Sequence, residues 1–134
     1  MGKLTTELKT AIEKAQLYPL ATCSKDGIPN VIPIKFIFIE DDDHLWLVDN
    51  FMSKTQQNLE ENPHAAINIW IDEDNVYLQL KGRTRIETSG SNVQLMREKV
   101  HAIKPDAPAK ALVIFEIDEI YQCLPGPNIG QRLD

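Results

Sequence analysis

The chain has 134 residues, close to the commonest size of one domain and enough to bury a sizeable core. Hydrophobic residues make up 43% and charged residues 25%, a composition that excludes an intrinsically disordered chain. The 14 basic and 20 acidic residues give a net charge of −6, which argues against a nucleic-acid binder, because phosphate backbones attract basic surfaces. Residues 1–134 are therefore expected to form a single globular domain.

The first elements in chain order are a helix and a long hairpin. Apolar residues recur at helical spacing at Leu4, Leu8, Ala11, Ile12 and Ala15. This spacing predicts an amphipathic helix over 4–17, followed by a strand at 18–24 and a tight glycine-containing turn at 25–27. A long apolar strand is expected at 30–40. Its Pro33 lacks the N–H group that a sheet ladder needs, so this position should lie at an edge, a bulge or an opening.

The rest of the chain alternates strands with two short helices. Strands are predicted at 45–49, 65–71, 76–87 and 111–124, and helices at 53–61 and 91–103. Residues 76–81 alternate apolar with polar side chains, as in a half-buried strand. Six strands joined mostly by hairpins indicate a mainly β fold with short helices, a closed six-stranded antiparallel barrel.

The segment Ser53-Lys54-Thr55 stands at the start of the helix that Asn62 and Pro63 end. Ser53 followed by Gln56 has the form of a capping box, which would make the segment a structural cap. The unpaired N–H groups of a helix start also favour an anion, and Lys54 would add a full charge. The local sequence alone favours capping.

Other kinds of site are not favoured by the sequence. His44, His64 and His101 have no histidine partner at i+4 and no cysteine pair nearby, so no metal site is expected. The acidic run 40–44 lacks the spacing of a calcium loop and is interpreted as a solvated turn. Cys23 lies in an apolar strand without an adjacent base and is interpreted as a structural thiol.

The strand that contains Pro33 changes the interpretation of the helix start. It precedes that start by one hairpin, and its exposed main-chain amides would face a flat heterocycle beside apolar side chains at Val31 and Ile34. An anion site next to an apolar slot with backbone donors suits flavin mononucleotide (FMN).

Over residues 19–122 the sequence resembles the FMN-binding split-barrel family, the family of pyridoxine 5′-phosphate oxidase. The resemblance rests on the order and spacing of four segments, LATCSKDGIPNVIPI, LWLVDNFMSKTQQNLEENP, AAINIW and LQLKGRTRIE. It implies a six-stranded split barrel, non-covalently bound FMN, and a homodimer with two equivalent sites at its interface.

The resemblance also implies which residues bind the cofactor. Ser53, Lys54 and Thr55 would contact the phosphate, and main-chain groups around Pro33, Ile34 and Lys35 would meet the polar edge of the ring. The same cleft would be lined by Val48, Asp49 and Asn50, with Asn30 and Val31 close by. From the partner chain of the dimer, Trp70 and Tyr77 would approach the flavin. No catalytic residue and no metal ligand are assigned.

The sequence departs from the vitamin B6 oxidases at two positions. Their strand beside the flavin carries an arginine and a lysine for the phosphate, where this chain has Ile32 and Ile37. Their C-terminal substrate-binding segment has no counterpart. The resemblance therefore implies an FMN-dependent oxidoreductase with an undefined small substrate. The alternatives are a flavin-binding or electron-carrier module without a substrate, or a split barrel that uses F420 or haem.

Two further expectations concern location and the C-terminal segment. No apolar run approaches a membrane span, residues 1–17 do not form a signal peptide, and Cys23 and Cys123 are expected to be reduced, so the chain is expected in the cytoplasm. The tail 125–134 is rich in proline and glycine, which suggests a defined path. We expect it to pack near the flavin and limit access.

Overall fold

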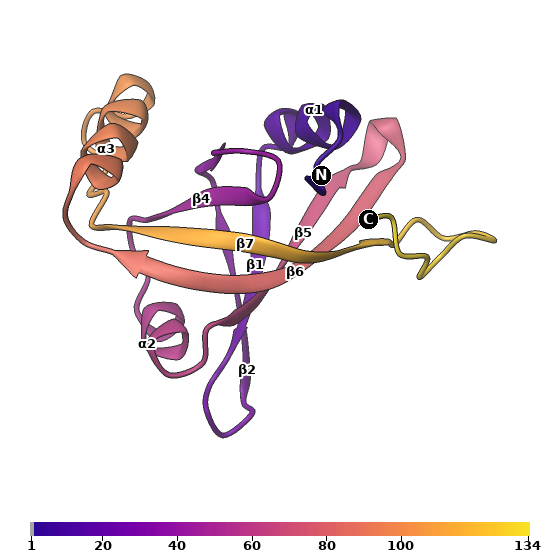
Figure 1. The fold of residues 1–134 in the computed structure, drawn as a ribbon, viewed down its shortest axis with the longest axis horizontal. Helices are drawn as coiled ribbons and strands as arrows, with labels where there is room; N and C mark the ends of the chain where they lie inside the picture. Colours follow the sequence, from indigo (N-terminus) through magenta and orange to yellow (C-terminus); the bar gives the residue numbers. More distant parts are fainter. Residues whose placement is uncertain (1) are drawn as a thin grey trace.

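Seven antiparallel strands form one strongly curled sheet in the computed structural model, which describes residues 2–134 (Figure 1). The strands are β1 (Tyr18–Cys23), β2 (Pro29–Ile34), β3 (Ile37–Ile39), β4 (His44–Asp49), β5 (His64–Ile71), β6 (Val76–Glu87) and β7 (Ala111–Gln122). Their order across the sheet is β2-β1-β5-β6-β7-β4-β3. The sheet curls into a half-barrel, so the expectation of a mainly β split barrel is confirmed.

The strand count differs from the prediction because the apolar run 30–40 is not one strand. It breaks at Lys35 and Phe36 into β2 and β3, which lie at opposite edges of the sheet. Pro33 pairs in register with Pro19 of β1 and lies on an edge strand, as expected for a residue without an N–H donor. The break gives seven strands instead of six, and it leaves the sheet open where β2 and β3 diverge.

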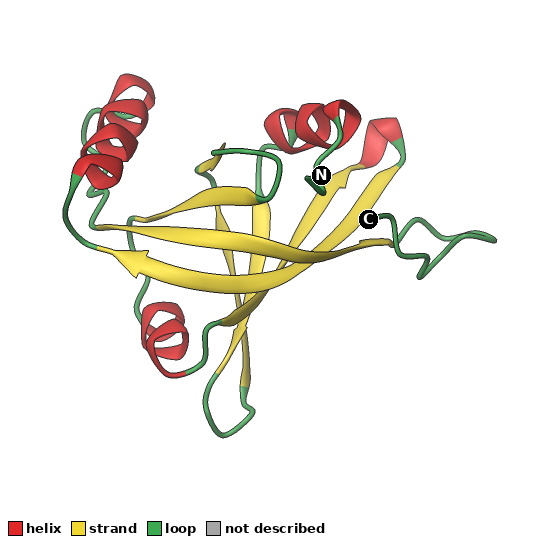
Figure 2. Cartoon of the chain, in the orientation of Figure 1, coloured by secondary structure: helices red, strands yellow, loops and turns green. Residues whose placement is uncertain are grey.

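Within residues 2–134, three α-helices and one short 3₁₀ helix lie around the sheet (Figure 2). They are α1 (Thr6–Lys14), α2 (Lys54–Glu61), α3 (Ser91–Ile103) and the 3₁₀ helix η1 (Asp72–Asp74). The first helix is shorter than the predicted 4–17. It begins after Thr5, whose side chain accepts the Leu8 N–H at 3.2 Å, and it ends before Ala15, which has extended backbone angles.

The pleat of β4 and β7 separates two apolar cores. Leu47 and Phe115 point to the inside of the half-barrel, where they pack with residues of α1, α2 and the other strands. Val48 and Leu112, which face each other across β4 and β7, point to the opposite face and pack against α3. Because successive side chains in a strand point to opposite faces, both strands are apolar on both sides.

Gly82 allows the long strands β6 and β7 to approach each other closely. Their register shifts between Lys81 and Gly82, and a Cβ atom at Gly82 would lie 2.1 Å from the Glu116 carbonyl oxygen. Only glycine fits at this distance, so the bulge depends on it.

The C-terminal tail folds back along the end of β7. Gly130 donates its N–H to the Gln122 carbonyl at 2.7 Å, and Leu133 donates to the Ile120 carbonyl at 2.8 Å. The Asp134 carboxylate accepts the Ile120 N–H at 2.9 Å. The tail therefore follows a defined path. Within residues 2–134, no helix is long and apolar enough to cross a membrane.

Candidate functional site

A cleft of about 370 Å³ opens where the sheet splits. It is bounded by the β2–β3 link, the β4–α2 turn and the loop between α3 and β7. The lining residues are Ile32, Pro33, Ile34, Lys35, Phe36, Val48, Asn50, Phe51, Met52, Lys104 and Ala107. Ile34 and Met52 belong to the half-barrel core, whereas Val48 and Ala107 belong to the α3 core, so the floor of the cleft is the junction of the two cores.

The α2 helix begins directly beside this cleft. Met52 lines the cleft, and Ser53 follows it as the residue before the helix. In the described chain, the Ser53 side chain makes no capping hydrogen bond, so the capping box expected from the sequence is not formed. Lys54 has no salt-bridge partner within residues 2–134. The helix entrance thus presents unpaired N–H groups, a free hydroxyl and an ammonium group at one end of an apolar slot.

Buried hydrogen bonds fix the start of α2 against β1 and β2. The Asn30 side-chain amide donates to the Thr55 hydroxyl at 3.0 Å and to the Thr22 hydroxyl at 3.3 Å. The Asn58 amide also donates to Thr22, at 3.1 Å. Thr22 and Thr55 are almost fully buried. Two of the predicted cofactor residues, Asn30 and Thr55, are therefore in direct contact and position the helix entrance.

Asp49 organises the β4–α2 turn. Its buried carboxylate accepts the Met52 N–H at 2.9 Å and lies 3.7 Å from the Lys110 ammonium group. The same ammonium group donates to the Met52 carbonyl at 3.2 Å, and the Lys110 N–H donates to the Asp49 carbonyl at 2.8 Å. These contacts join the turn to the α3–β7 loop.

The structure groups the sequence-predicted cofactor residues by their place around this cleft. The cleft is lined by Pro33, Ile34, Lys35, Val48 and Asn50. The helix entrance holds Ser53, Lys54 and Thr55, with Asn30 bonded to the last of these. Asp49 lies behind the turn. Val31 lies on the outer side of β2, lines a separate shallow hollow beside β5, and is 66% exposed.

Sequence reasoning missed the wall that comes from the α3–β7 loop. Lys104 and Ala107 line the cleft although more than fifty residues separate them from Asn50. Phe51 was also missed; it lies at the rim and is 78% exposed. The only local signal was the helix-breaking segment 105–108, which indicates a loop but not its neighbour in space.

The outer face of the sheet carries the residues expected to reach a partner chain. Trp70 and Tyr77 are opposite each other in the β5–β6 register, and Trp70 is 53% exposed. A larger hollow of about 580 Å³ lies over the same sheet, lined in part by Cys23, His64 and Arg132. None of the eleven predicted cofactor residues lines it, so the split of the sheet remains the candidate site.

The tail is absent from the cleft wall. None of the described residues lining the cleft comes from 123–134. Figure 1 shows the tail at the end of the molecule that holds α1, whereas α2 and α3 lie at the other end. Within one chain, the expectation that the tail packs beside the site is therefore not met.

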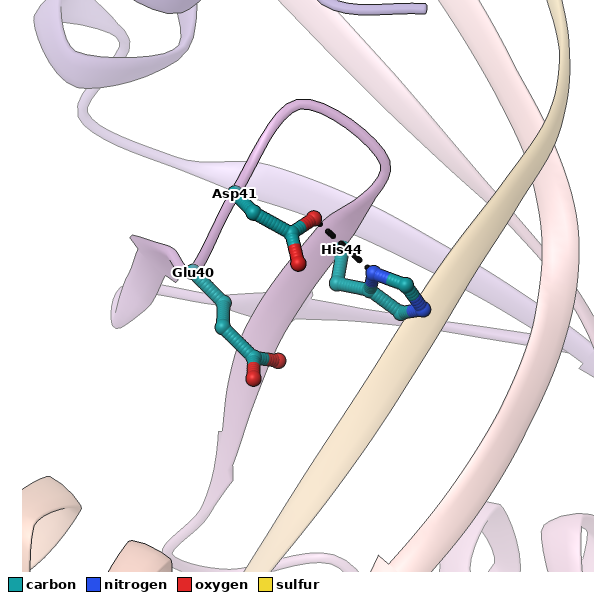
Figure 3. Close-up of side chains that lie close together, drawn as sticks. All are labelled: Glu40, Asp41 and His44. Carbon is teal, nitrogen blue, oxygen red and sulfur yellow. Dashed lines mark hydrogen bonds and ion pairs between the residues drawn. The ribbon is translucent and has the colours of Figure 1, made fainter. Parts of the chain in front are cut away.

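Three side chains of the kinds that can bind a metal ion lie close together at the turn before β4 (Figure 3). Ligand atoms of Glu40, Asp41 and His44 lie within 4.8 Å of one another. His44 Nδ1 is 2.8 Å from an Asp41 carboxylate oxygen, and Glu40 accepts the indole N–H of Trp46 at 2.9 Å. The hydrogen bond to Asp41 raises the pKa of His44 above 6.5, and Glu40 and Glu116 add to it. These groups are already engaged in holding the turn against β4.

Relatives of this chain are found among both sequences and solved structures. The uncharacterized protein MJ0282 of Methanocaldococcus jannaschii is 36% identical over 133 residues, which cover 98% of this chain and 88% of that protein. The crystal structure of HupZ from Group A Streptococcus superposes with a TM-score of 0.82 at 26% identity, covering 95% of this chain and 99% of the other. A putative pyridoxamine 5′-phosphate oxidase from Lactobacillus delbrueckii matches with a TM-score of 0.75 at 21% identity, covering 90% and 95%.

Proteins of the same fold at lower sequence identity are described as binding or using different cofactors. They include an FMN-binding protein from Syntrophomonas wolfei (16% identity, TM-score 0.67, 82% of this chain and 78% of the other). An F420 reductase matches at 16% identity and a TM-score of 0.69, over 87% and 98%. The haem storage protein HutZ of Vibrio cholerae matches at 18% identity and a TM-score of 0.63, over 90% and 94%. At these identities the likeness shows the fold alone.

The family itself follows from the sequence match. The family model described as pyridoxamine 5′-phosphate oxidase matches residues 4–124, which include every strand and the candidate cleft. The chain belongs to the pyridoxamine 5′-phosphate oxidase family of split-barrel proteins.

Proposed function

We propose that this protein binds FMN non-covalently in the cleft and acts as an oxidoreductase on a small substrate. The observation that carries the proposal is that the helix entrance at Ser53 follows directly in the chain on Met52, which lines the cleft. An apolar slot floored by Ile34, Val48 and Met52 leads into the entrance of α2, where Ser53 and Lys54 stand unpaired within the described residues. A flat heterocycle joined to a phosphate needs this sequence of surfaces.

The residues present fit the two ends of the cofactor differently. At the phosphate end, the N–H groups of the first turn of α2, the Ser53 hydroxyl and the Lys54 ammonium group would supply donors and positive charge. At the ring end, main-chain groups of the β2–β3 link around Pro33, Ile34 and Lys35 would meet polar atoms. Bound flavin would supply the redox chemistry, and the chain's residues would bind it, orient it and exclude water from one face.

Among the described residues of the cleft wall, only the two lysines, Lys35 and Lys104, carry ionisable side chains. Among the residues that line it, none is Asp, Glu, His, Cys or Tyr. This observation supports the second candidate function, a flavin-binding or electron-carrier module without a substrate of its own. It also weighs against haem, because a haem iron is held by an axial side chain such as His, Cys, Met or Tyr, and the Met52 in this wall is buried in the core. F420 would need the same apolar slot and remains the alternative flavin-like ligand.

A homodimer and a cytoplasmic location complete the proposal. Trp70, Phe51 and Val31 are large apolar side chains that are each more than half exposed. Phe51 lies at the cleft rim, Val31 on the outer side of β2, and Trp70 beside the residues that follow α1. A second copy would cover such surfaces, and Trp70 and Tyr77 of that copy would then approach the flavin. Sedimentation that shows a monomer at micromolar concentration would contradict this assignment.

The absorption spectrum of the purified protein tests the cofactor class. Bands of oxidised flavin would support the proposal, whereas a Soret band would point to haem. Fluorescence titration of the apoprotein with FMN and with riboflavin then isolates the phosphate. We expect FMN to bind more tightly than riboflavin, and Lys54→Ala to remove most of that difference.

Two control variants make the phosphate test specific. Lys25→Ala removes the same charge from the exposed β1–β2 turn and should leave FMN affinity unchanged. Ser53→Ala should leave the melting temperature unchanged because Ser53 forms no cap. A true N-cap serine would instead cost about 1 kcal/mol. If Lys54→Ala and Lys25→Ala bind FMN equally well, the helix entrance is not the phosphate site.

A further inference from the structure

Four carbonyl groups of the cleft wall have hydrogen-bond donors within the described chain. The Phe36 carbonyl accepts the Val48 N–H at 3.3 Å, and the Lys104 carbonyl accepts the Ala107 N–H at 3.1 Å. The Ala107 carbonyl lies 2.9 Å from His101 Nε2, which must donate because a carbonyl can only accept. With the Met52 carbonyl held by Lys110 at 3.2 Å, these wall acceptors are turned toward internal donors.

Asn50 presents the opposite hydrogen-bonding character. Its side-chain oxygen accepts the Ala109 N–H at 2.7 Å. This bond fixes the orientation of the amide, because a backbone N–H can pair only with the oxygen. The two N–H bonds of the Asn50 amide nitrogen are left for the cleft, which Asn50 lines.

The α3–β7 loop that orients Asn50 is itself held in place. Ala109 is fully buried and has a positive φ of 44°, an uncommon conformation for a residue with a side chain. Its carbonyl accepts the Arg97 guanidinium at 3.0 Å, and the same guanidinium donates to the Lys110 carbonyl at 3.1 Å. The backbone conformation at Ala109 is therefore supported by contacts from α3 and from the β4–α2 turn.

Positive charge adds to the donor character of the wall. Lys35 and Lys104 line the cleft and have no salt-bridge partner within residues 2–134. No carboxylate belongs to the lining, in a chain whose net charge is −6. The Asp49 carboxylate nearby is buried in the turn and paired with the Met52 N–H.

We infer that Asn50 and Lys104 make the ring side of the cleft a donor wall, rich in N–H groups and positive charge, which selects ligands that present an anionic or acceptor-rich edge on an aromatic ring. Asn50 is the specificity-determining residue, and Ala109 is the positioning residue that orients it. The inference rests on the proposed function only in taking the cleft as the ligand site. It concerns the ring and not the phosphate end at Lys54.

A pair of dyes can show whether the cleft selects a ligand by its negative charge or only by its apolar surface. 8-Anilinonaphthalene-1-sulfonate and N-phenyl-1-naphthylamine share the same aromatic body, but only the first carries an anion. Fluorescence titration of the wild-type protein should show tighter binding of the sulfonate. Asn50→Asp keeps an oxygen for the Ala109 N–H, removes the donors and adds a negative charge. It should weaken sulfonate binding by about tenfold or more, as expected for a lost hydrogen bond to a charged group, and leave the neutral dye within about twofold.

Matched variants control for net charge and for folding. Asn128→Asp makes the same chemical change in the exposed tail, away from the cleft, and should leave both affinities unchanged. Lys104→Met, which removes an exposed cation, should weaken sulfonate binding by about two- to fivefold. Thermal melting checks that the variants fold. An Asn50→Asp protein that melts like wild type and binds the sulfonate equally well overturns the inference, and so does an equal loss for both dyes.

An FMN titration of the same variants distinguishes the two proposals. Weaker FMN binding by Asn50→Asp supports both. If wild type binds no flavin but retains the dye selectivity, the proposed function fails and the donor wall stands. If wild type binds FMN and Asn50→Asp changes neither FMN nor dye affinity, the donor wall fails and the proposed function stands.

Discussion

The two ends of the molecule differ in how far their basic side chains form salt bridges. At the end that holds α1 and both described termini, cations are paired: Lys3 lies 3.0 Å from the Asp134 carboxylate, and Arg132 lies 2.9 Å from the same group. At the end that holds α2 and α3 (Figure 1), Lys35, Lys54 and Lys104 have no salt-bridge partner among residues 2–134. Salt bridges also occur at this end, such as Lys110 with Asp49 at 3.7 Å, but these three lysines at the cleft and the helix entrance take no part in them.

The contrast shows how an acidic chain can attract an anion. Exposed ion pairs contribute little free energy of folding, so the network at the α1 end serves chiefly to hold the termini and the 40–44 turn in register. Leaving three ammonium groups without a salt bridge costs correspondingly little stability, although the whole chain carries −6. These lysines belong to the end where we propose that the ligand binds.

The largest effect is expected from Gly82→Ala, which tests whether both ends share one cooperative sheet. A Cβ atom would meet the Glu116 carbonyl oxygen at 2.1 Å and the Phe115 ring at 2.8 Å, so β6 or β7 must move. We expect a loss of about 3 kcal/mol in the free energy of unfolding, measured by urea denaturation. Both ends should unfold in one transition.

Gln79→Ala on the same strand provides the control, because Gln79 lies on the outer face and packs against no backbone in this way. A Gly82→Ala protein as stable as this control would show that the strands tolerate a wider separation. Two separate transitions would show that the ends are independent units.

The next largest effect is expected at Asp49, the one buried carboxylate of the cleft end among the described residues. Asp49→Ala leaves the buried Met52 N–H without its acceptor, which should cost about 2 kcal/mol of stability. Asp49→Asn keeps an oxygen for this N–H and should cost less. Because Asp49 supports the turn from behind, restoring the acceptor should also restore ligand affinity. Equal losses of affinity in both variants would instead indicate that the charge itself takes part in binding.

The sequence predicted elements well where local patterns decide them. Helix α3 was predicted at 91–103 and is found there, and the turn at 25–27 has the expected positive φ at Gly27. The run 30–40 shows the limit of this reasoning. Continuous apolarity does not reveal that the chain changes sheet edge at Lys35 and Phe36, because that break is decided by which strands lie alongside.

The candidate site likewise contains residues that local sequence patterns could predict and residues that they could not. Residues close in sequence to the helix entrance or to Pro33 could be predicted, because each lies in a recognisable segment. Lys104 could not be predicted, because its place in the cleft depends on hydrogen bonds between distant residues such as Asn50 and Ala109. The tail was expected near the flavin because its prolines and glycines suggest a defined path; the path is defined, but hydrogen bonds to β7 hold it at the α1 end.

The smallest expected effect concerns His44. It tests the charged contacts at the α1 end through the pH dependence of the melting temperature. The hydrogen bond to Asp41 raises the pKa of His44 above 6.5, with Glu40 and Glu116 contributing. A raised pKa means that folding favours the protonated form, so this stabilisation is fully present below the unfolded value of 6.5 and is lost as the pH rises through the folded value. The melting temperature of wild type should therefore exceed that of His44→Gln by a small margin at acidic pH, and the margin should shrink above neutrality. Ligand affinity should not change between the two proteins, because His44 is at the other end from the cleft. The titration of the His44 ring, followed by NMR, gives the direct measurement. A pKa at or below 6.5 would show that Asp41, Glu40 and Glu116 do not stabilise the protonated ring.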